Sequence, residues 1–90
     1  MQKGLTNESL GILIRAERVE GISLCYSEVT KDWALYVSHS DRQLRGDLCT
    51  ERGHSRRFKT SDTALMLLHK LGYKGQIRFD YLTAAEIAAA

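Results

Sequence analysis

The stretch RRFKTSDTALMLLHKLGY, residues 56–73, decides the fold, because it combines a short basic strand with a helix whose two ends are marked. Thr60 or Ser61 can accept a backbone N–H of the first turn, and Asp62 places negative charge at the positive end of the helix dipole. Gly72 can adopt the left-handed conformation that ends a helix. The apolar face comprises Ala64, Leu67, Leu68 and Leu71, widened by Leu65 and Met66.

The segment from Thr6 to Gly21 allows two readings. A Thr or Asn cap, Glu8 in the first turn and an apolar side favour a helix that stops at Gly21. Gly11 lowers helix propensity, and apolar residues also alternate here as in a strand. The sequence leaves both open.

Alternating apolar residues predict strands over residues 22–27 and 33–38, joined as a hairpin, followed by a polar loop over residues 39–46. The alternation places Trp33 and Tyr36 on opposite faces, so we expect one of them to be exposed.

A second hairpin is expected where residues 47–50 and 56–59 flank a turn that contains Gly53. A last strand follows over residues 77–81. We therefore predict an α+β fold: an antiparallel sheet of about four to five strands with one or two helices packed on one face. Residues 1–82 would form a single globular domain, and residues 83–90 an Ala-rich tail that frays or docks weakly.

The composition is that of a globular chain, with 43% hydrophobic and 27% charged residues and a formal net charge of +2 among 90 residues. A chain this small buries a limited core, so a homodimer is one expected state. No signal peptide or membrane span is evident, which predicts a cytoplasmic protein with no membrane partner. In that compartment Cys25 and Cys49 are expected to be free thiols.

Basic residues are concentrated between Arg42 and Lys59, where only Asp47 and Glu51 oppose them. A two-stranded ribbon can lie along a phosphate backbone, and guanidinium groups bind phosphate well. Phe58 alternates with its basic neighbours and is expected in the core. The candidate nucleic-acid contacts are Arg42, Arg45, Arg52, His54, Arg56, Arg57 and Lys59.

Catalytic and cofactor signatures are weak. The cysteines and histidines have no paired metal-ligand spacing, and the glycines form no phosphate-binding loop. His39, Ser40 and Asp41 are adjacent in sequence, whereas a catalytic triad needs side chains that converge. We predict no catalytic residue, no metal and no cofactor.

The run from Leu48 to Tyr73 resembles small proteins carried on plasmids and conjugative elements, some of them labelled partition accessories. The resemblance rests on Arg52-Gly53, Arg56, Phe58, Asp62, Ala64, Leu68 and Leu71-Gly72. It implies a role in plasmid maintenance or transfer, with contact to DNA or to a DNA-bound partner, and it implies no catalytic residue.

The function predicted first is a non-enzymatic nucleic-acid-binding accessory protein of a mobile element, which contacts phosphates through the basic hairpin. The alternative is a protein-interaction module, an inhibitor or adaptor that uses a sheet edge or the arginine cluster. A small enzyme is the third alternative.

Overall fold

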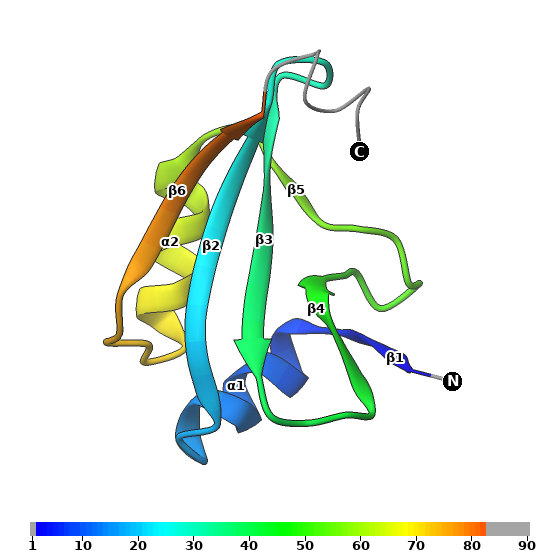
Figure 1. Cartoon of the computed structure of the whole chain (residues 1–90), viewed down its shortest axis with the longest axis vertical. Helices are drawn as coiled ribbons and strands as arrows, with labels where there is room; N and C mark the ends of the chain where they lie inside the picture. Colours follow the sequence, from blue (N-terminus) through cyan, green and yellow to red (C-terminus); the bar gives the residue numbers. More distant parts are fainter. Residues whose placement is uncertain (1, 83–90) are drawn as a thin grey trace.

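The computed structural model describes residues 2–82, which form an α+β fold with two helices and six strands (Figure 1). The elements, in chain order, are β1 (Lys3–Leu5), α1 (Asn7–Arg15), β2 (Val19–Ser27), β3 (Asp32–His39), β4 (Leu44–Leu48), β5 (Arg57–Phe58), α2 (Ser61–Lys70) and β6 (Ile77–Leu82). The prediction for residues 83–90 lies outside this described part of the chain.

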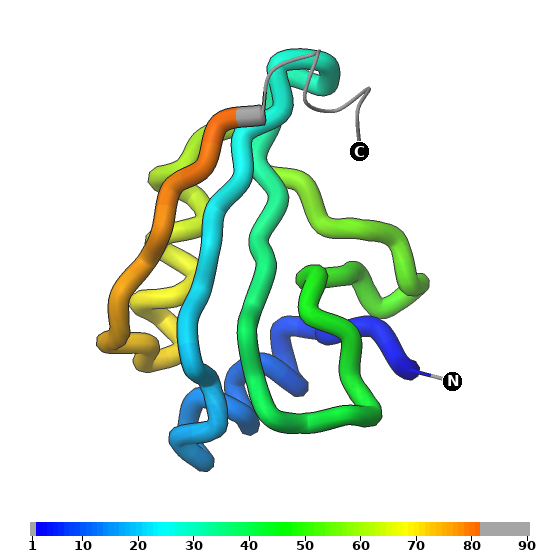
Figure 2. Tube along the Cα trace, in the orientation of Figure 1, coloured from blue at the N-terminus to red at the C-terminus, as the bar shows by residue number. Residues whose placement is uncertain are grey.

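The sheet has the strand order β1-β4-β3-β2-β6, and β5 also pairs with β3. β3 runs antiparallel to β2, β4 and β5, whereas β1 is parallel to β4 and β6 is parallel to β2. The predicted α+β class is confirmed, but the sheet is mixed and not antiparallel throughout. Figure 2 shows the reason for β6: the chain passes from β5 through α2 before it enters β6. Such a crossover lets β6 run in the same direction as β5, and therefore parallel to β2.

Helix α2 forms as its signals predict. The Thr60 side chain accepts the Thr63 N–H at 3.3 Å. At the other end Gly72 has a φ of 86°, and the Tyr73 N–H donates to the carbonyl of Leu68. The prediction that Met66 widens the apolar face is wrong, because its side chain is 71% exposed. At about 100° per residue, Met66 lies roughly 200° from both Ala64 and Leu68, the two buried residues of this helix.

The first segment is a helix. The side chain of Thr6 accepts the Ser9 N–H, and the Ser9 hydroxyl accepts the Thr6 N–H, so the two residues form a capping box. The predicted stop at Gly21 is wrong: α1 ends at Arg15, Glu17 turns the chain with a φ of 57°, and Gly21 lies within β2.

The hairpin of β2 and β3 is confirmed, with Leu24 opposite Leu35. Trp33 is buried and Tyr36 exposed, as their alternation predicts. The loop that follows is shorter than residues 39–46, because β4 begins at Leu44. Strand β1 was not predicted, since three residues give no readable alternation.

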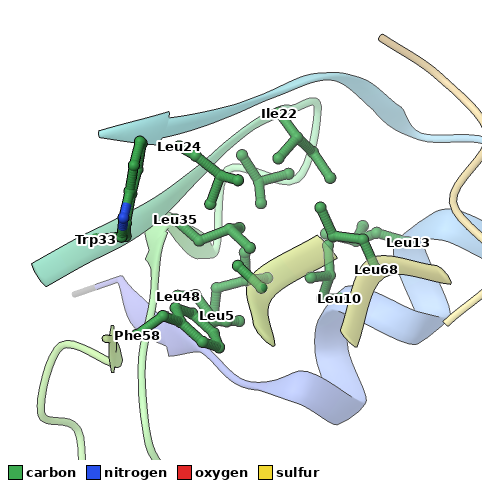
Figure 3. Close-up of a cluster of buried hydrophobic side chains, with 12 residues drawn as sticks. Leu5, Leu10, Leu13, Ile22, Leu24, Trp33, Leu35, Leu48, Phe58 and Leu68 are labelled. Atoms are coloured by element: carbon green, nitrogen blue, oxygen red, sulfur yellow. The ribbon is translucent and has the colours of Figure 1, made fainter. Parts of the chain in front are cut away.

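The core lies between one face of the sheet and the two helices (Figure 3). Its members come from every strand except β6 and from both helices; Ile77 of β6 packs against them. Phe58 is in this core, as predicted, with 3% of its surface exposed. Within residues 2–82 no helix has the length and apolar character needed to cross a membrane.

Candidate functional site

The basic segment is built around a tight turn. The Thr50 N–H donates to the His54 carbonyl at 2.7 Å, Cys49 and Ser55 form an isolated antiparallel bridge, and Gly53 has a φ of 87°. The predicted hairpin turn is therefore present, with Arg52 exposed in it. Its two arms separate beyond this bridge, because β4 and β5 each pair with a different part of β3.

Two of the seven candidate contacts are ion-paired. The Arg45 Nε lies 3.5 Å from Asp47 Oδ1, and the Arg57 Nε lies 3.7 Å from Asp32 Oδ1. Both arginine side chains are about two-fifths exposed, so water screens the pairs and leaves each worth little stability. Each pair nevertheless reduces the positive charge offered to an anionic ligand.

Arg56 contacts an aromatic ring. Its guanidinium lies over the ring of Phe58, with Cζ 5.2 Å from the ring centroid. Phe58 is itself buried and lies opposite Trp33 in the sheet. Arg56 is thus anchored on the helix-covered side, whereas Arg57, which alternates with Phe58, belongs to the other face.

The structure distributes the seven residues over separate places. Arg42 lies in the loop between β3 and β4, where its carbonyl accepts a hydrogen bond from Gln2. Arg52 and His54 lie in the turn, and Lys59 follows the end of β5. All four side chains are exposed, and none of them forms an ion pair within residues 2–82. They come from three different segments: the loop between β3 and β4, the turn after β4 and the end of β5.

Arg56 lines an apolar groove that runs along α2, with a volume of about 510 Å³. Phe58, Met66 and Leu67 are among the apolar residues that line it. Its titratable members within the described chain are all basic or imidazole groups: Arg56, His69 and Lys70. Apolar surface with a few polar groups of one sign is a common arrangement for a binding groove.

Met66 is a member of this groove that the sequence pattern did not indicate. Helical spacing could have indicated it. Met66 is two positions from both Ala64 and Leu68, and residues two positions apart on a helix point to nearly opposite sides. Its apolar character alone favours the core.

A second, polar groove of about 490 Å³ lies beside the loop between β3 and β4 and includes His39 and Asp41. The His39 Nδ1 accepts the Asp41 N–H at 3.1 Å, and its Nε2 lies 3.0 Å from the Arg45 carbonyl. This arrangement assigns the proton to Nε2, so both ring nitrogens hold the loop in place.

The two cysteines are free, as predicted. Cys49 is buried, with Sγ 3.3 Å from Arg45 Nη2, and Cys25 is half-buried on the open face of the sheet. Burial, followed by the nearby Asp80 carboxylate, raises the pKa of the Cys25 thiol, which disfavours the reactive thiolate. In the part of the chain that the structure describes, no three His, Cys, Asp or Glu side chains are grouped to hold a metal.

Comparison of the chain with protein-family models, curated protein sequences and solved structures finds no match. The resemblance of residues 48–73 to plasmid-borne proteins stays a prediction.

Proposed function

We propose that this chain is a non-enzymatic protein-interaction module whose groove along α2 binds an amphipathic segment of a partner protein. The partner segment is apolar along one side and carries acidic residues beside it. The single observation that carries the proposal is the exposure of Met66 on an apolar groove with a basic rim.

The apolar side of the segment would fill the groove. An exposed methionine that lines the groove together with Phe58 and Leu67 offers a contact surface that adapts to different side chains, because the thioether chain is flexible and polarizable. Burying such a surface against a partner removes apolar area from water, which is the main favourable contribution to association.

The acidic side of the segment would face Arg56 and Lys70. Arg56 is already positioned by its ring contact with Phe58, so less side-chain freedom is lost when a carboxylate binds it. Because no acidic side chain lines the groove within residues 2–82, an acidic segment meets no like charge there.

The test is selection of a displayed peptide library on the wild-type chain, with counter-selection on Met66→Glu. We expect enrichment of peptides that combine acidic residues with apolar residues at helical spacing. Their Kd should rise about tenfold or more for Met66→Glu and for Lys70→Glu, whereas Met66→Leu keeps the affinity. Enrichment of basic peptides, or binding that Met66→Glu leaves unchanged, would reject the proposal.

Nucleic-acid binding is the second candidate, favoured by the exposed and unpaired Arg42, Arg52 and Lys59 within the described residues. This role matches what the resemblance to plasmid-borne proteins implies. Titration with duplex and single-stranded DNA at two salt concentrations tests it. Replacing one phosphate contact should reduce the log–log salt slope by about 0.9 on duplex DNA. Absence of binding at both concentrations would eliminate this candidate, and Met66→Glu should not affect it.

A further inference from the structure

Strand β6 forms an open edge of the sheet. Within residues 2–82 it pairs only with β2, and Figure 1 shows it as the outermost strand on its side. Half of its backbone N–H and C=O groups therefore point away from the sheet, ready to pair with another strand. No proline or bulge interrupts it: all six of its residues are in register with β2.

Exposed aromatic rings stand beside this edge on the helix-covered face. Phe79 is 46% exposed and Tyr81 is 66% exposed. Both rings contact the buried Trp33, with centroids 5.9 Å and 5.5 Å from it, so they are fixed in position while their outer surfaces meet water. Large apolar rings held next to an open strand edge are typical of an interaction surface.

The opposite face of the same strand carries one positive and one negative residue. Arg78 and Asp80 alternate with the aromatic residues and form an ion pair within the strand, with Arg78 Nε 3.1 Å from Asp80 Oδ1. The strand sequence IRFDYL thus has opposite charges placed symmetrically about Phe79.

We infer that β6 pairs antiparallel with β6 of a second copy of this chain, with Phe79 opposite Phe79 of the second copy. This goes beyond the proposed groove and uses a different surface. The two sheets would join into one continuous sheet around a two-fold axis, as in an isologous dimer.

Charge complementarity selects this occupant and this register. With Phe79 on the axis, Arg78 of each copy lies opposite Asp80 of the other, and Ile77 lies opposite Tyr81. The helix-covered faces of the two sheets lie on the same side only when a residue of β6 lies on the axis. If that residue is 78 or 80 and not 79, Arg78 lies opposite Arg78, or Asp80 opposite Asp80. Like charges directly opposite each other destabilise a strand pair, whereas opposite charges stabilise it.

The test is sedimentation equilibrium of the wild-type chain and of the single reversals Arg78→Asp and Asp80→Arg. We expect a wild-type monomer–dimer equilibrium in the micromolar to millimolar range, because one strand pair forms a small interface. Each reversal places like charges opposite each other twice, so the dimer Kd should rise about tenfold or more. Arg15→Asp on α1 and Glu51→Arg in the turn change the net charge equally and should leave the dimer Kd unchanged.

Mixing the two reversed variants gives the decisive result. Every charge on one variant then faces its opposite on the other, so a heterodimer should form with about the wild-type affinity although each variant alone dimerises about tenfold or more weakly. Loss of the ion pair within one strand cannot produce that rescue. A wild-type chain that stays monomeric at every concentration, or a dimer that both reversals leave intact, would overturn the inference.

Discussion

Arg57 and Asp32 form an ion pair where β5 joins β3, with Nε 3.7 Å from Oδ1. The Asp32 carboxylate also accepts a hydrogen bond from the Thr30 hydroxyl at 2.6 Å. This aspartate therefore connects the turn after β2 to the basic segment. Because Asp32 neutralises part of the charge of Arg57, the basic segment offers less positive charge at the surface than its sequence suggests.

Replacing Arg57 by alanine should cost little stability. The Arg57 side chain is 42% exposed, so solvent screens the pair, and we expect the free energy of unfolding to fall by less than about 1 kcal/mol. Urea denaturation of Arg57→Ala at low and at high salt measures this. A loss of several kcal/mol would mean that the pair is structurally essential.

Phe58→Ala should be severely destabilising, with a loss of about 3–5 kcal/mol, because a ring that is 3% exposed leaves a cavity beside Trp33. Met66→Ala is the matched comparison, because Met66 also lines the groove but is 71% exposed, and it should change stability by less than about 0.5 kcal/mol. Thermal denaturation of both variants tests these two expected losses of stability. Equal losses would contradict the exposure of Met66.

Gly72→Ala should destabilise the end of α2. Gly72 has a φ of 86°, where a side chain costs about 1–2 kcal/mol of strain. Gly21→Ala serves as the control, because a Cβ there meets no atom within 4 Å and its φ is ordinary for an L-residue. Chemical denaturation should show a clear loss of stability for Gly72→Ala alone. A larger loss of stability for Gly21→Ala would count against the structure of β2.

The Cys25 thiol should react slowly at neutral pH. Burial and Asp80 raise its pKa, and Arg78 only partly opposes them. The folded chain therefore holds this proton more tightly than the unfolded chain, so stability falls as the pH rises above the ordinary thiol pKa of about 8.5.

Iodoacetamide labelling of Cys25 in a Cys49→Ala background measures that prediction. The midpoint of the rate against pH should lie above that of an unstructured cysteine peptide. A midpoint below the peptide value would show an activated thiol and would contradict the assignment.

Local interactions made much of this fold predictable. The caps of α2, the turn at Gly53 and the alternation in the two central strands each depend on residues within a few positions of one another. The burial of Phe58 and the exposure of Tyr36 follow from the same alternation. The sequence also indicated the basic segment, and hence one member of the groove, Arg56.

Tertiary structure decided the rest. The pairing of β1 with β4 and of β6 with β2 joins segments about 40 and 55 residues apart, a separation at which side-chain period carries no information. The ion pair of Arg57 with Asp32 and the contact of Arg56 with Phe58 depend on how β5 meets β3.

By itself, then, the sequence determined the class of fold, both ends of α2 and the inward or outward direction of most strand residues, since these follow from short-range geometry. Only the folded chain decided the mixed sheet, the open edge at β6 and the division of the basic residues between two faces. Those features come from pairings between distant segments, which are selected by burial of the whole core and not by any one stretch of residues.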